Sequence, residues 1–447
     1  MEKKILHNLY YNLLGYRHFL LAYSGGVDST VLLHQLIQLR KLCPYIHLRA
    51  IHIHHNISRN ADSWLLHCQQ QCKVWNIPLS IVKIQINVQE IKEHGLESAC
   101  RKARYNACDQ VIRDKEVLLT AHHLNDQCET FLLALKRGSG PTGLAAMRSL
   151  IKIRENQTII LRPMLLQSWT QIHTWAQVHQ LSWIHDESND DLHLDRNFFR
   201  LKILPLLHEK WPYFSQNVAR SAKLCSDQVN LVYELLTPLV TSLIRSDGSL
   251  RIDELHKHSE VYRSEILRYW LAKQKIIPSY LQIQCIWRDV ICSRRDATPC
   301  VRIGKYEIRR FRNAIYSIDL LPSLEDIIIP WACPWRTLKL PSKLGSLQFD
   351  GEEGINVRSP SLKELNQITV RFKALDSFYL LGREGSRHIK KIWQELNVPP
   401  WMRHRIPLIF YGNKLIAALE LFITQDGAPR KPLSWFLKWK KKYSNQD

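Results

Sequence analysis

The sequence predicts an N-terminal α/β domain with a doubly wound parallel sheet, then a mainly helical domain and a small α+β domain at the C-terminus. Short apolar segments alternate with helical patterns over about the first 135 residues, which is typical of a parallel sheet. The glycine-rich and polar motifs of this region directly follow apolar segments. Ligands of such sheets bind beyond the carboxyl ends of the strands, so these motifs mark the expected site.

The predicted elements follow one another in this alternating order. Strands are expected at Phe19–Tyr23, Leu48–Ile53, Ser80–Ile84, Val117–Ala121 and Thr158–Arg162, and helices at Thr30–Leu42, Arg59–Trp75 and Ile91–Arg113. Further helices are expected at Ser215–Ile244, Asp253–Ala272, Ser279–Ser293 and Ser386–Leu396, and strands within Thr298–Asp319, at Ile368–Phe372 and in a hairpin over Pro407–Leu421. The predicted domains are residues 1–210, 211–320 and 363–447, with a proline-punctuated linker containing short strands at 321–362.

Composition limits the class of protein. The 62 Lys and Arg residues outnumber 41 Asp and Glu, giving a net charge of +21, which favours a nucleic acid partner over a merely solvated basic surface. No apolar run approaches the roughly 18–20 residues of a membrane span, and the N-terminus lacks a secretory apolar segment. We therefore expect a cytoplasmic protein without a membrane partner.

The 11 cysteines are scattered, and no Cys-x-x-Cys occurs. His67, Cys68 and Cys72 share one expected helix, but three potential ligands without a fourth are a weak zinc signal. Free thiols in a reducing compartment are the favoured interpretation.

A short Ser/Gly loop between the first strand and the first helix is the strongest single motif. It consists of Ser24, Gly25, Gly26, Val27, Asp28 and Ser29. The glycines let the backbone bend toward a ligand, and the unpaired N–H groups that open the helix favour an anion. The loop lacks the spacing of a Walker A motif, and a capped turn without a ligand is the plainer alternative. It resembles the pyrophosphate loop of the ATP pyrophosphatases, which split ATP into AMP and pyrophosphate.

A histidine and two carboxylates follow the fourth strand. If a helix begins near Leu124, Asp126 and Glu129 share one face, and His122 lies at the strand end. Such a group can hold Mg²⁺, orient an amine or accept its proton, although ordinary acidic capping of a helix would give the same pattern.

Three basic strings complete the set of motifs. Arg101 and Arg104 fall on one helical face with Glu97 and could reach a phosphate, or could form a solvated face. A Gly-rich turn covers 135–144, and Arg196 and Arg200 lie four residues apart at the start of a later helix.

Taken in order, these strings resemble the tRNA(Ile)-lysidine synthase family. The matching strings are Ser-Gly-Gly-Val-Asp-Ser, Glu-x-x-x-Arg-x-x-Arg-Tyr, His-His-Leu-Asn-Asp-Gln-x-Glu-Thr, Lys-Arg-Gly-Ser-Gly-x-x-Gly-Leu and Asp-Arg-Asn-Phe-x-Arg. The segment 390–401 looks like the family's C-terminal domain, and 321–362 is the least clearly matched stretch. Asn125 departs from the commonest pattern, in which many members carry Asp, while Asp126 is kept.

The resemblance implies an adenine nucleotide hydrolase-like fold and ATP-dependent ligation of L-lysine to C2 of the wobble cytidine in the isoleucine tRNA with a CAU anticodon. It implies ATP and Mg²⁺ at the Ser24–Ser29 loop, with Asp28 assisting the metal or pyrophosphate, and His52 and Ile53 lining the adenosine pocket. Arg104, His122, Asp126 and Glu129 match active-site residues, and Arg196, in preference to Arg200, would contact phosphate. Members commonly form dimers, so a homodimer is an expectation.

Two other functions stay open at this point. A tRNA thiolase of the same superfamily usually has a Cys-x-x-Cys, which this chain lacks. An RNA-binding protein with an inactive nucleotide fold would not need the intact acidic and histidine motifs.

The basic, aromatic tail from Trp435 to Tyr443 could stack on RNA bases or form a packed terminal helix.

Overall fold

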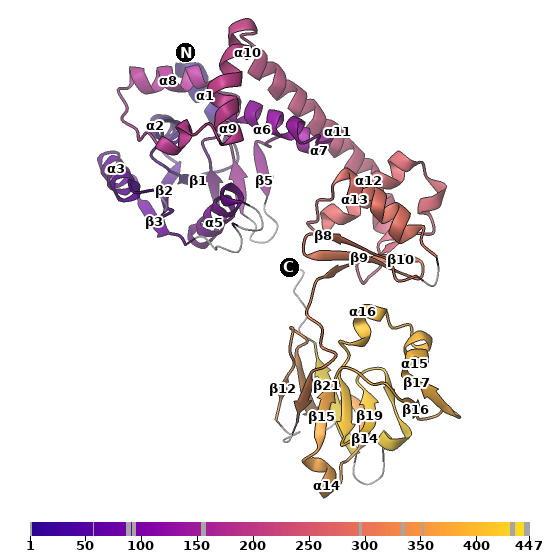
Figure 1. The fold of residues 1–447 in the computed structure, drawn as a ribbon. Helices are drawn as coiled ribbons and strands as arrows, with labels where there is room; N and C mark the ends of the chain where they lie inside the picture. The colour runs from indigo at the N-terminus through magenta and orange to yellow at the C-terminus, as the bar shows by residue number, and fades with distance from the viewer. Residues whose placement is uncertain are drawn as a thin grey trace. The chain divides into compact units, whose positions relative to one another are not determined.

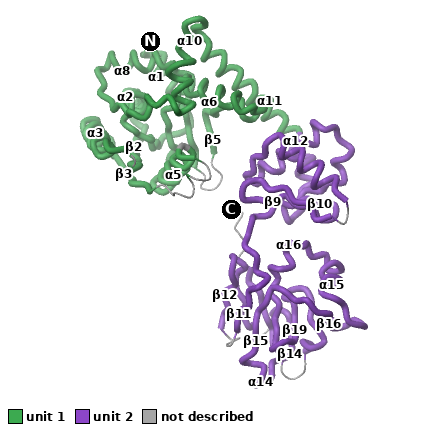
Figure 2. The backbone as a smooth tube through the Cα atoms, in the orientation of Figure 1, with its two compact units in different colours: residues 1–235 green, residues 236–447 purple. Residues whose placement is uncertain are grey.

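The structure is a computed structural model that describes residues 2–56, 58–85, 91, 95–152, 158–294, 297–331, 336–350, 353–429 and 434–441. The chain divides into two compact units, residues 1–235 and 236–447 (Figure 2). No helix in these ranges is long and apolar enough to cross a membrane.

The first unit contains a six-stranded sheet in the order β3-β2-β1-β4-β6-β5. Figure 1 labels β1, β2, β3 and β5 of this sheet. Its strands are β1 (His18–Ala22), β2 (His47–His54), β3 (Leu79–Lys83), β4 (Glu116–Leu119), β5 (Leu150–Lys152) and β6 (Ile159–Leu161). All neighbours pair in parallel except β5 and β6, which are antiparallel. The predicted parallel α/β fold is confirmed.

Alternating side chains of β1 explain why both faces of this sheet are covered. Phe19 and Leu21 enter one buried cluster with α1, α2, α3 and α8, whereas Leu20 enters another with α5. The helices of this unit are α1 (Glu2–Asn12), α2 (Val27–Leu42), α3 (Ala61–Val74), α5 (Leu96–Val111), α6 (Leu124–Lys136), α7 (Pro141–Leu144), α8 (Trp169–Val178), α9 (Asp195–Phe198) and α10 (Leu204–Lys210). A 3₁₀ turn η1 (Glu187–Asp190) and a π-helical turn η2 (Phe199–Ile203) lie among them, and α11 (Phe214–Leu243) follows.

The strand order places a topological switch point between β1 and β4. The chain adds β2 and β3 on one side of β1 and then returns to add β4 on the other side. Connections that diverge in this way leave a crevice at the carboxyl ends of the two central strands. The Ser/Gly loop follows β1 and the His122–Glu129 motif follows β4, so the fold brings these two motifs together.

The second unit begins with helices packed on a small sheet. It contains α12 (Glu260–Lys273), α13 (Tyr280–Cys285) and the π-helical turn η4 (Ile286–Ile291), with η3 (Leu255–Lys257) before them. The four-stranded sheet has the order β7-β10-β9-β8, from β7 (Leu250–Arg251), β8 (Cys300–Ile303), β9 (Tyr306–Phe311) and β10 (Ala314–Asp319). The helix predicted for 253–272 is therefore a 3₁₀ turn followed by an α-helix that Ser259 caps through the Tyr262 N–H.

The rest of the second unit is rich in strands. The strands are β11 (Ile328–Pro330), β12 (Leu338–Lys339), β13 (Ser346–Asp350), β14 (Ile355–Arg358), β15 (Ile368–Arg371), β16 (Ser377–Tyr379), β17 (Ser386–His388), β18 (Leu408–Tyr411), β19 (Lys414–Ala418), β20 (Phe422–Ile423) and β21 (Ser434–Lys440). The helices are α14 (Leu362–Leu365), α15 (Ile389–Glu395) and α16 (Pro400–Arg403), and η5 (Gln425–Gly427) is a 3₁₀ turn. The strands within 321–362 pair with later ones, β11 with β15, and β13 and β14 with β21. The predicted hairpin is confirmed as β18 and β19, with Gly412 at φ +61° in its turn.

Two local predictions in this region are wrong. The helix expected from Ser386 begins at Ile389, because residues 386–388 form β17 and His388 caps the helix by accepting the Lys390 N–H. The terminal helix considered for the tail is instead the strand β21, in which Leu437 and Trp439 are buried at alternate positions. A period of two suits a strand with one packed face. Lys442 and Tyr443 lie outside the described residues.

Candidate active site

The loop after β1 is held in a conformation that requires glycine at one position. Gly25 has φ +84°, and a Cβ built there would lie 2.4 Å from Ile184 Cδ1 and 2.8 Å from Cys68 Sγ. The Gly25 carbonyl also accepts the Ile184 N–H at 2.9 Å. Positive φ and close packing together explain why this residue has no side chain.

Hydroxyl groups fix the rest of this loop. Ser29 Oγ donates to the Gly26 carbonyl at 3.0 Å and lies 3.1 Å from Ser24 Oγ, while Thr30 Oγ1 donates to the Gly25 carbonyl at 3.2 Å. Gly26 is the N-cap of the 16-residue helix α2 and supplies no side-chain cap. The first N–H groups of α2 are thus left for a ligand, and the dipole of a long helix favours an anion there.

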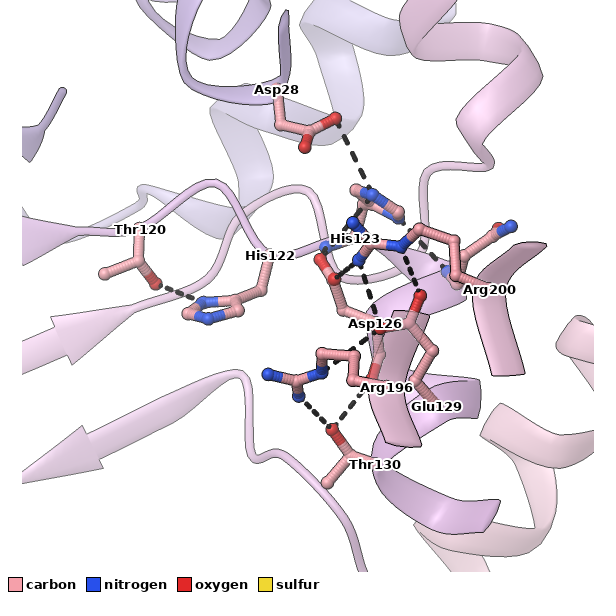
Figure 3. Close-up of polar contacts among 10 residues, drawn as sticks. Asp28, Thr120, His122, His123, Asp126, Glu129, Thr130, Arg196 and Arg200 are labelled. Atoms are coloured by element: carbon pink, nitrogen blue, oxygen red, sulfur yellow. Dashed lines mark hydrogen bonds and ion pairs between the residues drawn. The ribbon is translucent and has the colours of Figure 1, made fainter. Parts of the chain in front are cut away.

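His123 connects the loop to the acidic motif. It caps α6: its Nδ1 accepts the Asn125 backbone N–H at 3.1 Å, so the neutral ring carries its proton on Nε2. That Nε2 lies 3.6 Å from both Asp28 Oδ1 and Asp126 Oδ2, and the side chain is 2% exposed (Figure 3). His122, and not His123, was the histidine predicted from the sequence to act in this site. The available signal was its position immediately before the helix, where a side-chain acceptor caps the first turn.

Glu129 and Asp126 form ion pairs with two arginines, as Figure 3 shows. Arg200 Nε and Nη2 donate to the two Glu129 oxygens at 2.7 and 3.0 Å, and Nη2 also donates to Asp126 Oδ1 at 2.8 Å. Arg196 Nε lies 3.2 Å from Glu129 Oε2, and its Nη2 donates to Thr130 Oγ1 at 3.2 Å. Both arginines of the Asp-Arg-Asn-Phe-x-Arg string therefore reach the acidic group, including Arg200, which was the second choice from sequence.

The carboxylates of this site have different proton affinities. Burial raises the pKa of Asp28, with Asp126 adding to the rise, and burial also raises the pKa of Glu129 against the opposing effect of Arg200 and Arg196. Burial opposes the ionisation of Asp126 too, but neighbouring histidines, Arg200 and the His123 backbone N–H outweigh it and lower its pKa. Asp126 thus stays ionised under neutral conditions and can attract a cation.

His122 lies at the same edge of the sheet but is held differently. Its Nδ1 is 2.9 Å from Thr120 Oγ1, and burial lowers the pKa of the imidazole to about 3, with nearby arginines adding to the effect. His122 is consequently a neutral ring near neutral pH.

The remaining predicted residues make no contact with Asp126 or Glu129 among those of the described residues. His52 is buried and its Nδ1 donates to the Tyr23 carbonyl at 3.0 Å, which ties β2 to the end of β1, while Ile53 is half-buried against the core beneath. Arg104 is exposed on α5. Burial lowers the pKa of His55, and the charge of Arg104 adds to this effect. Among the contacts of the described residues, none joins Arg104 to Asp126 or Glu129.

Asp28 is the residue of this site that could hold a metal ion. Within the described ranges, no three His, Cys, Asp or Glu side chains form a closed metal cage. Mg²⁺ is usually held by one or two carboxylates together with phosphate oxygens and water. Asp28 Oδ1 is buried and accepts no hydrogen bond from the described residues, so this carboxylate beside the loop fits such a role.

Family comparisons cover most of the chain. A PP-loop domain matches residues 1–207, a TilS substrate binding domain matches 250–316, and a TilS substrate C-terminal domain matches 368–439. A "tRNA(Ile)-lysidine synthase" of Serratia proteamaculans (strain 568) is 46% identical over 429 residues, 96% of each chain. One of Escherichia coli O157:H7 is 45% identical over 416 residues, 93% of this chain and 94% of the relative.

Solved structures add little to this result. The "U34-tRNA thiolase NcsA" of Methanococcus maripaludis is 18% identical with a TM-score of 0.44, covering 50% of this chain and 78% of that chain. The full-length sequence relatives and the three matched domains agree with the motifs brought together at β1 and β4. The chain belongs to the tRNA(Ile)-lysidine synthase family.

Proposed function

We propose that this protein uses ATP to join L-lysine to C2 of the wobble cytidine in the isoleucine tRNA with a CAU anticodon. The observation that carries the proposal is the contact of His123 with both Asp28 and Asp126 at 3.6 Å. It places a phosphate-binding loop beside a carboxylate that can hold an amine. The tRNA thiolase and the inactive nucleotide fold have no comparable support, because the relatives are named for lysidine synthesis.

The reaction would proceed in two steps at this crevice. The cytidine O2 attacks the α-phosphate of ATP, and pyrophosphate leaves toward the N-terminus of α2. The lysine ε-amine then attacks C2, and AMP leaves with the former O2. To reach the loop, the target base must leave its stack in the anticodon.

The charged side chains and His122 would have different roles in these two steps. Asp126, which stays ionised, attracts the ε-ammonium and accepts its proton before attack. Arg196 is 27% exposed in its side chain and stabilises negative charge on the transferring group, and Arg104 does so from the solvent side. His122, neutral near pH 7, orients a substrate group by hydrogen bonding.

Magnesium would be held by Asp28 together with the phosphate oxygens of ATP. When bound, the ion neutralises phosphate charge and helps pyrophosphate to leave. Asp28 is 33% exposed in its side chain, so it can reach a ligand seated on the loop.

The tRNA body would lie on basic surface of residues 208–447, contacted mostly through phosphates. The large excess of positive charge supports a polyanionic partner. Under this proposal the protein works in the cytoplasm, where tRNA, ATP and lysine are present together. A homodimer stays a prediction, which sedimentation velocity would check.

The test is incorporation of labelled lysine into a tRNA(Ile) transcript with a CAU anticodon, in the presence of ATP and Mg²⁺. The wild-type chain is compared with Asp126→Ala and with Asp114→Asn, which changes an exposed carboxylate of the same unit. Label that needs ATP and disappears only in Asp126→Ala supports the proposal. If pyrophosphate is released with tRNA but no label is incorporated, lysine is the wrong nucleophile. If neither pyrophosphate nor labelled tRNA forms, the remaining interpretation is an RNA-binding function.

A further inference from the structure

The pairing of Arg200 with Glu129 has the properties of a permanent structural contact. Glu129 is 0% exposed, and two parallel N–H···O bonds from one guanidinium hold its carboxylate. Fork-to-fork pairs of this kind are strong and geometrically specific. Without Arg200 this buried carboxylate would lose its two-bond pair and keep only the Arg196 Nε contact at 3.2 Å, so Arg200 is expected to stay on Glu129.

The contact of Arg200 with Asp126 has different properties. A single nitrogen, Nη2, donates to Asp126 Oδ1 at 2.8 Å while also serving Glu129. The Asp126 side chain is 13% exposed and that of Arg200 is 31% exposed, so this contact lies nearer to solvent. The other Asp126 oxygen is held by the His123 backbone N–H at 3.0 Å. Oδ1 is therefore the position of Asp126 at which one cation can replace another.

The carboxylates nearest the amine position already have cationic partners. Arg200 and Arg196 pair with Asp126 and Glu129, and the third carboxylate, Asp28, is the one proposed to hold magnesium. A substrate ammonium must therefore replace an existing contact. Arg200 also belongs to the π-helical turn η2, between α9 and α10. Single π turns within helices often occur at functional sites.

We propose that Arg200 occupies the position on Asp126 that the lysine ε-ammonium takes during the reaction, and so sets the affinity of the site for lysine. The inference rests on the proposed function. Arg200 is a positioning residue: it stays on Glu129 and yields Oδ1 when the substrate ammonium arrives. Before lysine binds, its positive charge keeps Asp126 ionised and correctly oriented. A lysine that binds must displace this contact, which weakens its binding and leaves the amine easier to deprotonate.

The test separates lysine affinity from turnover in the full-length protein. L-lysine is titrated calorimetrically into the ATP-bound protein, and the KM for lysine and kcat are measured for wild type, Arg200→Gln and Lys202→Gln. Lys202 is an exposed cation on the same turn and serves as the matched control. We expect Arg200→Gln to lower both the Kd and the KM for lysine by about fivefold or more, which is the size of a modest coupling between competing ligands. The kcat of this variant should also be lower. Lys202→Gln should change neither.

A second variant guards against loss of folding. In Arg200→Lys the shorter side chain keeps a positive charge on Glu129 but cannot span both carboxylates. The KM for lysine should therefore also fall, but by less than in Arg200→Gln. An unchanged or increased KM in the folded variants would overturn the inference and leave Arg200 as a purely structural residue. If the wild type neither binds lysine nor releases pyrophosphate with tRNA, the proposed function itself fails. An active wild type with unshifted variants refutes only the role of Arg200.

Discussion

Replacing Gly25 by alanine tests whether the loop after β1 depends on its backbone conformation and on its packing. The residue has φ +84°, where an L side chain is strained, and its missing Cβ would lie 2.4 Å from Ile184 Cδ1 and 2.8 Å from Cys68 Sγ. Gly26 is the matched control in the same loop. It has φ −69°, and a Cβ there would meet only Ser24 Oγ at 3.5 Å, an ordinary contact.

The expected magnitude has two parts. A left-handed conformation costs a non-glycine residue about 1–2 kcal/mol. Overpacking of a filled site adds about 1–3 kcal/mol, and the lower half applies because Ile184 Cδ1 is the end of a flexible side chain. Gly25→Ala should thus lower the free energy of unfolding by about 2–4 kcal/mol. Gly26→Ala should cost less, about 0.5–1 kcal/mol, because alanine is only a poorer N-cap than glycine there.

Urea unfolding measures these changes. Because a ligand stabilises the unit that binds it, the transition that moves to a higher urea concentration when ATP is added is that of the first unit. Ile184→Ala removes the atom in closest conflict but leaves Cys68 Sγ at 2.8 Å, so in that background Gly25→Ala should lose less than in the wild type, though not less than the conformational part of about 1–2 kcal/mol. ATP affinity of Gly25→Ala should fall about tenfold, as expected if more than 1 kcal/mol is needed to restore the loop. Equal stabilities of the two alanine variants, or no relief from Ile184→Ala, would refute this account.

Three further changes have effects that the structure predicts. Glu116→Gln breaks an ion pair in which two Arg49 nitrogens donate to the Glu116 carboxylate at 2.7 and 2.8 Å. Denaturant titration should show a loss of about 3 kcal/mol in the free energy of unfolding, and no loss would mean that the pair is dispensable. Burial lowers the pKa of His34 to about 4, so the unfolded chain takes up a proton first as pH falls from about 6.5, and stability should decline toward pH 4. His34→Gln, which can still accept the Trp175 indole N–H, should flatten that decline in urea midpoints compared between pH 7 and 4.5, and an unchanged slope would exclude His34 as its source. Leu437→Ala empties a buried site on β21 and should destabilise the second unit by about 2–5 kcal/mol in thermal scans. An unchanged melting temperature would show that Leu437 does not contribute to the core of that unit.

Most of the N-terminal sheet could be predicted because local pattern and global fold agree there. The segment Phe19–Tyr23 is apolar throughout, as a strand covered on both faces must be, and β1 lies within one residue of it at each end. The tail was less predictable. Leu437 and Trp439 alternate with Lys438 and Lys440, but Phe436 breaks the pattern before them, and a short basic segment with aromatic residues also suits a helix. Only pairing with β13 and β14 selects the strand.

The sequence by itself determined the phosphate-binding loop, the acidic helix face and the family to which both belong, because each is a local string whose spacing carries its chemistry. The tertiary structure alone decided which charges meet. His123 faces Asp28, about a hundred positions away in the chain, and Arg200 reaches Glu129 over a separation of 71 residues. Those contacts depend on strand order and on the register of a helical turn, and Coulomb interactions act through space rather than along the chain.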